Sequence, residues 1–414
     1  MRLITPLLIL SVALMVSCTE KKPVDRMNDE QLRSYADELA HKNIITDGHV
    51  DLPYRLKMKN FRLEREYMTI PVSTTEGDFD YERAKKGGLD APFMSIYIPS
   101  SYQQQPDMGK VLADSLINMI RTIAVEIPDK FALANSTAEI DANFKAGKIS
   151  LPMGMENGAP IGNDLANIKY FYDRGIRYIT LTHGKDNQIC DSSYDTTHTW
   201  NGLSPFGEQV VKEMNRVGIM VDISHVSDST FYDVVKLTNV PVIASHSSCR
   251  AFTPDFQRNM NDDMIKKLGE NGGVIQINFG SAFLDSTVRA RNDINRKKLK
   301  GILDEKGLTP SDSLAKPMIE QFRNENPSLF ADVEIVANHI DHVVKLAGID
   351  HVGIGSDFDG VGDSLPTGLK DVSQYPNLIY ALLKRGYTEE DIAKICYQNV
   401  WRVWNNVEQA AKGN

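Results

Sequence analysis

Short apolar segments rich in β-branched residues recur along the chain, and most of them end in polar residues. We identify eight such segments, at residues 43–51, 92–99, 149–157, 177–183, 218–225, 240–248, 272–280 and 351–360. Most of the intervening stretches carry apolar residues at helical spacing, as in 108–127, 206–218, 228–238 and 263–272. Strands that alternate with helices pair in parallel. Eight such units predict an α/β fold, a closed (β/α)8 barrel of the TIM type.

The polar residues at the strand ends are the candidate chemistry. In a (β/α)8 barrel the carboxyl ends of the strands form the active-site face, so these side chains are expected to meet there. His49 and Asp51 are two residues apart, a spacing that directs both side chains to one face of a strand. A polar turn after a core strand would explain this pair alone. The full set favours a metal site: His49, Asp51, Glu156, His183, His225, His246 and Asp357.

The types of these side chains indicate which metal and which reaction. Imidazole and carboxylate ligands suit Zn²⁺, and a carboxylate can bridge two ions. The set is large enough for two ions, which lie roughly 3.5–4 Å apart in sites of this kind and lower the pKa of bound water. The residues therefore predict hydrolysis at a polarised carbonyl or phosphoryl centre.

The composition is that of a globular protein, with 414 residues of which 42% are hydrophobic and 24% charged. We interpret residues 19–40 as a tether and first helix, and residues 41–408 as a single domain. The net charge of −9 argues against nucleic acid as a partner, because phosphate binding needs clustered Lys and Arg. Apart from Cys18 the chain has an odd number of cysteines without close spacing, so neither a disulfide framework nor a thiolate zinc site is expected.

The first residues resemble an export signal. One Arg precedes an apolar run from Leu3 to Val16, and the stretch from Met15 to Cys18 resembles a bacterial lipobox. We predict a lipoprotein signal peptide over residues 1–18, with lipid on Cys18 attaching the protein to a membrane of the bacterial cell envelope, at its periplasmic or outer face. Plain signal cleavage and an uncleaved anchor are the alternatives.

Several longer motifs occur in a specific order and spacing. They are DGHVDLP (47–53), MEN (155–157), RGIRYITLTH (174–183), GLSPFGEQVVKEMNRVGIMVDISHVS (202–227), PVIASHSS (241–248), RNMNDD (258–263), GGVIQINF (272–279), HVGIGSDFDG (351–360) and QNVWRVW (398–404). With these motifs the chain resembles the membrane dipeptidase (renal dipeptidase) family of zinc peptidases, peptidase family M19. The resemblance implies a barrel of the metal-dependent amidohydrolase kind that binds two Zn²⁺ ions and cleaves dipeptides.

The resemblance also implies roles for the ligands. His49 and Asp51 match the family's ligands to the first zinc ion, and His225 and His246 match the ligands to the second. Glu156 matches the carboxylate that bridges the two ions. Members of the family are often dimers, so a homodimer is an expectation too.

Three further residues match family positions that handle the substrate. His183 matches a histidine at the scissile carbonyl, Arg258 an arginine that receives the substrate carboxylate, and Asp357 the acid/base aspartate. The implied mechanism is attack by a hydroxide that the two ions share, with Asp357 carrying its proton to the leaving amine. An Arg fork suits a carboxylate, and a donor aimed at the oxyanion stabilises the transition state.

The chain departs from the family pattern at three places. Asn157 follows Glu156, where the family commonly has Gly. Residues 184–195, after His183, differ from the corresponding run in animal members, so side-chain preference does not carry over. Residues 281–333 form a long, highly charged insertion that we predict to be helical, and both a lid over the barrel mouth and a solvated decoration are consistent with it.

The remaining histidines that we considered match no ligand. His198 is interpreted as a loop residue, His339 and His342 as structural residues of an outer helix, and His351 as the start of the last strand. Two other functions stay open on the residues alone. One is a related binuclear metallohydrolase acting on other amides, lactones or phosphoesters, although such enzymes more often use a carboxylated lysine as the bridge. The other is a lipid-anchored protein that binds peptides without cleaving them.

Overall fold

The computed structural model describes residues 23–58, 71–310 and 312–413. Parallel strands close into a barrel in the order β1-β10-β9-β8-β7-β6-β5-β2, so the predicted (β/α)8 barrel is confirmed. Its strands are β1 (Ile45–Val50), β2 (Leu89–Tyr97), β5 (Met153–Glu156), β6 (Ile176–Thr180), β7 (Met220–Asp222), β8 (Ile243–Ser247), β9 (Val274–Ile277) and β10 (Val352–Ile354). Each lies within or overlaps a strand segment that the sequence predicts.

One predicted segment, 149–157, contains two strands. β4 (Ile149–Leu151) pairs with β3 (Phe131–Leu133) in a separate two-stranded sheet, and β5 begins after Pro152. Proline has no N–H to donate to a strand ladder, and here it separates the two pairings. Only β5 belongs to the barrel and carries Glu156 to its open end.

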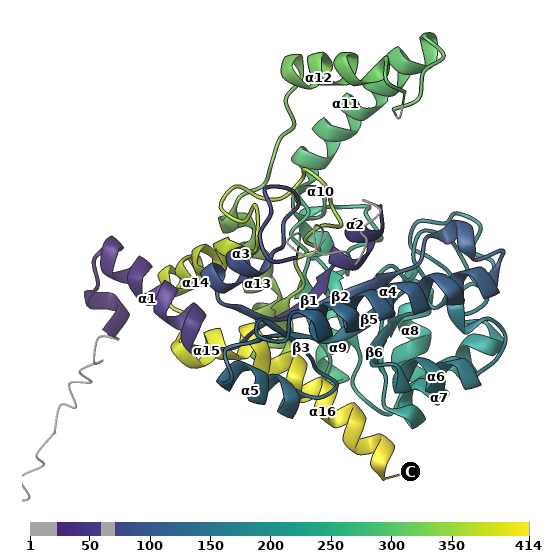
Figure 1. Ribbon diagram of the computed structural model, residues 1–414, viewed down its shortest axis with the longest axis horizontal. Coiled ribbons are helices and arrows are strands. Elements are labelled where there is room, and N and C mark those ends of the chain that lie inside the picture. The colour runs from purple at the N-terminus through teal and green to yellow at the C-terminus, as the bar shows by residue number, and fades with distance from the viewer. Residues whose placement is uncertain (1–22, 59–70, 311, 414) are drawn as a thin grey trace, which may run out of the picture.

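Helices surround the strands (Figure 1). They are α1 (Asp29–Lys42), α2 (Leu52–Met58), α3 (Tyr81–Gly87), α4 (Pro106–Glu126), α5 (Thr137–Lys145), α6 (Ala166–Asp173), α7 (Pro205–Val217), α8 (Asp228–Leu237), α9 (Asp262–Glu270), α13 (Val333–Ala347), α14 (Tyr375–Lys384), α15 (Glu389–Ala393) and α16 (Asn399–Lys412). The bounds of α7 follow from its sequence: the Ser204 side chain caps the first turn, Pro205 takes the first helical position, and Gly218 ends it at φ 94°. None of the helices in the described part of the chain is long and apolar enough to cross a membrane.

The C-terminal helix α16 closes one end of the barrel. Trp404 is fully buried, with its ring 5.3 Å from that of Phe93, which in turn lies 5.3 Å from the ring of Tyr178. Met220 and Ile243, at the starts of β7 and β8, belong to the same apolar cluster. Because this cluster fills the end at which the strands begin, only the end at which they finish is left for a site.

The charged insertion is helical, as predicted. It comprises α10 (Ser281–Leu284), α11 (Ser286–Glu305) and α12 (Ala315–Glu325). Figure 1 shows α11 and α12 projecting as an arm away from the barrel, with α10 at the base. The arm therefore joins the body beside the open end of the barrel.

Candidate metal centre and active site

Strand ends position seven polar side chains at the open end of the barrel. Glu156 is the last residue of β5, and His49 and His246 lie within β1 and β8 near their ends. The other four residues follow β1, β6, β7 and β10 directly or within three residues: Asp51, His183, His225 and Asp357. Six of the seven residues are at most 9% exposed, and the His183 side chain is 24% exposed. The structure thus brings together the whole set that the sequence singled out.

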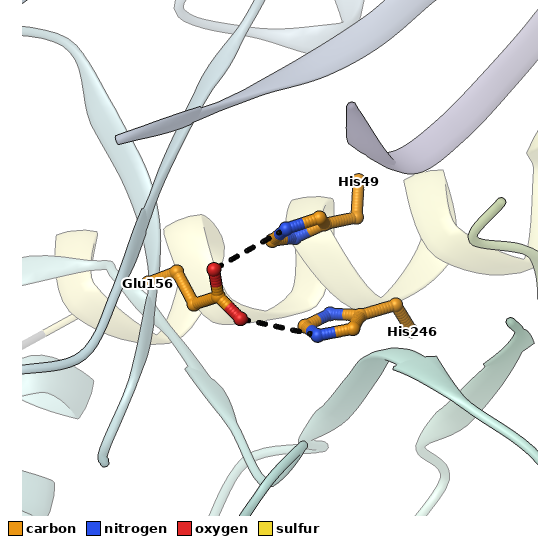
Figure 2. Close-up of side chains that lie close together, drawn as sticks. All are labelled: His49, Glu156 and His246. Carbon is orange, nitrogen blue, oxygen red and sulfur yellow. Dashed lines mark ion pairs between the residues drawn. The ribbon is translucent and has the colours of Figure 1, made fainter. Parts of the chain in front are cut away.

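Glu156 lies at the centre of the cluster. Its Oε1 atom is 3.0 Å from His225 Nε2 and 3.3 Å from His246 Nε2, and its Oε2 atom is 3.5 Å from His49 Nε2. Asp51 Oδ2 is 3.4 Å from the same His49 nitrogen. Figure 2 shows the carboxylate of Glu156 directing one oxygen to His49 and the other to His246. This is the arrangement expected of a carboxylate that bridges two cations.

The hydrogen bonds around His49 fix which of its nitrogens faces the cluster. The Tyr178 hydroxyl donates to the Gly48 carbonyl at 3.0 Å, so it must accept at 3.0 Å from His49 Nδ1–H. In the neutral imidazole, the form that binds a metal ion, the acceptor is then the other nitrogen, Nε2. It is buried and has no hydrogen-bond partner among the described residues, and the same is true of Asp51 Oδ1.

His246 is fixed in the same way from β7. The Ser245 hydroxyl donates to Asp222 Oδ2 at 2.6 Å and therefore accepts from His246 Nδ1–H at 2.7 Å. His246 Nε2 is left as a lone pair that faces Glu156 and lies 2.9 Å from His225 Nε2. Lone pairs and carboxylates converging on one point repel one another unless a cation lies among them. The donor set therefore fits divalent metal ions with a preference for nitrogen and oxygen, such as Zn²⁺.

Burial and charge shift the pKa values in the cluster strongly. Burial holds the pKa values of His225 and His246 well below the usual histidine range. Burial alone would raise the pKa of Glu156, but His49 and His183 hold it well below its usual range. Burial raises the pKa of Asp357 to about 8; the charges of Asp51 and Glu156 add to the rise, although His49 opposes it.

Two members of the set have unusual backbone conformations. His225 and Asp357 adopt φ values of 66° and 63°, in the left-handed region that residues with a Cβ rarely occupy. Such strain is common at functional sites, where the surrounding structure holds it. Here the two residues are His225, whose Nε2 lies 3.0 Å from Glu156 Oε1, and Asp357, which lines the cavity.

A cavity of about 1140 Å³ opens above the cluster. His183 and Asp357 lie on its wall, together with Tyr97, Tyr194 and Phe256. Asn278 Nδ2 donates to Asp357 Oδ2 at 2.7 Å and orients this carboxyl group. Glu156 and His225 also line it, so a substrate in this cavity would reach the cluster directly.

Arg258 lies beside the cluster and is 3% exposed. It donates from Nη1 to Ser247 Oγ and from Nη2 to the His246 carbonyl, both at 2.7 Å. Its Nε is buried without a hydrogen-bond partner among the described residues. The guanidinium is thus held in place while part of its donor capacity stays unused.

The other histidines lie outside the cluster. His198 is an exposed residue on the cavity rim, and His342 is paired with Asp262. His339 is buried, accepts from the Cys249 N–H at 3.0 Å and donates to the Leu284 carbonyl at 2.9 Å. His351 contacts the Gly273 carbonyl at the start of β10. The three cysteines of the described chain are free and buried: Cys190, Cys249 and Cys396.

A family model described as membrane dipeptidase, peptidase family M19, matches residues 33–414. The chain belongs to the membrane dipeptidase family. Crystal structures of related proteins resemble this chain over most of its length. The probable dipeptidase PvdM from Pseudomonas aeruginosa has 25% sequence identity and a TM-score of 0.77, over 92% of this chain and 100% of that one.

Two further structures belong to the same comparison. The dipeptidase AC, a metallopeptidase of family M19, has 25% identity and a TM-score of 0.72, over 88% of this chain and 99% of that one. A metallopeptidase from Rhodobacter sphaeroides, liganded with a phosphinate mimic of the dipeptide L-Ala-D-Ala, has 25% identity, a TM-score of 0.71 and the same coverage. Family and structures together support a metallo-dipeptidase on an amidohydrolase-type barrel.

The membrane dipeptidase pattern commonly has Gly where this chain has Asn157, and the structure explains why both fit. Asn157 adopts φ 80°, which Gly reaches freely and Asn tolerates better than most residues. Its amide donates to the Ile98 carbonyl at 2.9 Å. Asn at position 157 therefore allows the same backbone conformation after Glu156 as Gly would.

Sequence reasoning missed the residues behind the ligands. Tyr178, Ser245 and Asp222 fix two imidazoles, and Asn278 orients Asp357. The sequence could have indicated two of them, because Ser245 is adjacent to His246 and Asp222 is three residues before His225. Nothing in the sequence indicated the role of Tyr178, since a tyrosine in an apolar strand is typical of a barrel core.

Proposed function

We propose that this protein is a zinc-dependent dipeptidase that hydrolyses the peptide bond of dipeptides. The observation that carries the proposal is the position of Glu156 between His49 on one side and His225 and His246 on the other, at the base of an open cavity in a membrane dipeptidase barrel. A carboxylate with imidazoles on both oxygens suits a pair of metal ions.

The ligand roles follow the donor atoms. His49 and Asp51 would hold one zinc ion, His225 and His246 the other, and Glu156 would bridge them. Zinc bound by this set would supply a Lewis acid for the carbonyl and a lowered pKa for water. A bridge supplied by Glu156 would favour a dipeptidase over barrel hydrolases that use a carboxylated lysine.

His183 is the proposed donor to the carbonyl oxygen. It extends into the cavity with Nε2 3.6 Å from Glu156 Oε1, so a carbonyl bound at the cluster would lie within its reach. Burial lowers the pKa of its imidazole. A neutral imidazole N–H that points to the developing oxyanion stabilises the transition state more than the ground state.

Asp357 is the proposed acid/base. It lies on the cavity wall next to the ligand set, with Asn278 holding one of its oxygens. Asp357 would take the proton of the attacking water and return it to the leaving amine, which has to be protonated to depart.

Arg258 is the proposed receptor for the free C-terminal carboxylate of the substrate. Ser247 and the His246 carbonyl fix its orientation, and its Nε–H, which has no partner among the described residues, would be available to a carboxylate. A carboxylate held this close to the cluster leaves room for one residue after the scissile bond, so longer peptides are excluded. The ligand in the Rhodobacter sphaeroides relative supports dipeptides with a C-terminal D-residue as further substrates.

We further propose that lipid on Cys18 anchors the enzyme to a bacterial envelope membrane, where dipeptides from outside the cytoplasm would reach it. Cys18 and the signal peptide lie outside the described residues. The homodimer also stays a prediction.

The test is a substrate panel. A chain starting at residue 19 would be stripped of metal with a chelator and assayed on L,L-dipeptides, L,D-dipeptides and a tripeptide, before and after zinc is added. We expect zinc to restore cleavage of dipeptides only. Zinc binding without cleavage of any dipeptide would move the function to other amides, lactones or phosphoesters, or to peptide binding.

A further inference from the structure

The insertion that forms the arm also supplies part of the wall of the catalytic cavity. Arg289, in the first turns of α11, lines the cavity together with Tyr194 and Phe256. The carbon at the centre of its guanidinium lies 3.6 Å from the centroid of the Phe256 ring. A guanidinium stacked on an aromatic ring keeps its N–H groups in the plane, free to bind an anion at their edge.

No carboxylate partner of Arg289 is found among the residues that the structure describes. None of the ion pairs between described residues includes it, although Asp255 and Asp293 also line the cavity. Asp293 is 2.9 Å from Arg296, one helical turn further along α11. A cation without a counter-ion on the wall of a cavity is a candidate for substrate recognition.

Aromatic rings connect Arg289 to the proposed carboxylate receptor. The Arg258 guanidinium lies 5.6 Å from the centroid of the Phe283 ring, and the Phe283 and Phe256 rings are 5.6 Å apart. Arg289 stacks on the far member of this pair. A residue whose α-carboxylate binds Arg258 would therefore direct its side chain along this aromatic wall toward Arg289.

We infer that Arg289 selects dipeptides whose C-terminal residue has an acidic side chain, aspartate or glutamate. This inference rests on the proposed dipeptidase function and names a substrate class for it. The side-chain carboxylate would accept charge-assisted hydrogen bonds from Arg289 while Phe256 and Phe283 contact its methylene groups. Neutral dipeptides would still be cleaved, with lower efficiency.

The test compares L-Ala-L-Glu with L-Ala-L-Gln, which have nearly the same shape and differ in charge. A hydrogen bond to a charged group changes a binding constant by roughly tenfold or more. The zinc-loaded enzyme should therefore show a kcat/KM for L-Ala-L-Glu about ten times that for L-Ala-L-Gln. Arg289→Gln should reduce this ratio to about one, and Arg289→Glu should shift the preference to L-Ala-L-Lys. Arg291→Gln is the matched control, because Arg291 is exposed on the same helix and does not line the cavity.

The possible outcomes separate the inference from the function on which it rests. Hydrolysis of both dipeptides with equal kcat/KM, or a ratio that Arg289→Gln leaves unchanged, would overturn the role of Arg289 and keep the dipeptidase. If neither dipeptide is cleaved while zinc is bound, the proposed function fails and the role of Arg289 fails with it.

Discussion

Individual side chains behind the ligands prepare the cluster for metal. Tyr178 and Ser245 contact no substrate in our account, yet each fixes a proton on the far nitrogen of an imidazole. Without these hydrogen bonds, His49 and His246 could present a protonated nitrogen to the cation. Partners of this kind typically change metal affinity by 10–100-fold.

Tyr178→Phe should therefore weaken zinc binding by about 10–100-fold, because it removes the acceptor of His49 Nδ1–H and keeps the aromatic ring in the core. Competition with a chromophoric chelator would measure the affinity. Tyr170→Phe is the control, since the Tyr170 hydroxyl bonds to Asp114 on the outer helices. Equal zinc affinity in all three proteins would show that the hydroxyl does not fix the ligand.

Asp357→Asn should lower kcat by about 10²–10⁴-fold. The amide has nearly the same size and shape as the carboxyl group, but it cannot take up and release a proton. Zinc content should stay at the wild-type value, which elemental analysis would verify. Loss of a zinc ion would instead identify Asp357 as a ligand, a reading that its position near His49 and Asp51 allows. The exposed Asp363, changed to Asn, serves as the control.

Whole strands were easier to predict than the contacts between them. All barrel strands overlap predicted segments, because alternating strands and helices mark the parallel barrel and the polar residue at each strand end marks the site. The division at Pro152 was missed, since apolar residues flank it on both sides. The side-chain partners of Tyr178 and Ser245 depend on which strands become neighbours, and a single sequence does not contain that information.

β2 contains a buried carboxyl group, that of Asp90, which should make folding stability depend on pH. Asp90 is 3% exposed, and burial raises its pKa to about 7, although Lys85 opposes the rise. The folded state thus binds a proton that the unfolded chain has already released, so stability should fall as the pH rises from about 4 to about 7.

Asp90→Asn removes this pH-dependent protonation, while the amide oxygen of the new side chain can still accept from Ile45 N–H. The free energy of unfolding of the variant, relative to wild type, should increase from about pH 4 to about pH 8, by roughly 1.4 kcal/mol for each unit of pKa shift at most. Denaturant titrations across this range would measure it. Parallel profiles for the two proteins, like those expected for the exposed Asp129→Asn, would contradict the assignment.

The whole molecule has one closed and one open end. α16 fills the end at which the strands begin, and the cluster, the cavity and the base of the arm occupy the other. Because α11 supplies Arg289 to the cavity wall, the insertion contributes to the site and does more than decorate the surface. α11 and α12 do not cover the barrel in Figure 1, because they project away from it.

Attachment to a membrane is the prediction that concerns the intact protein in its cell. Cys18→Ala should move the full-length chain from the membrane fraction to the soluble fraction, because it removes the thiol to which the lipid would be attached. Metabolic labelling with a fatty acid should mark the wild type only. A Cys18→Ala protein that stays in the membrane fraction would argue against lipid at this position.

Zinc titration of the metal-free enzyme tests the binuclear dipeptidase most directly. Hydrolysis of L-Ala-L-Ala and zinc bound per chain would be measured in the same samples. We predict that hydrolysis is absent without metal, rises with added zinc and reaches its maximum at two ions per chain. Full activity without zinc, or two bound ions with no hydrolysis, would contradict the account.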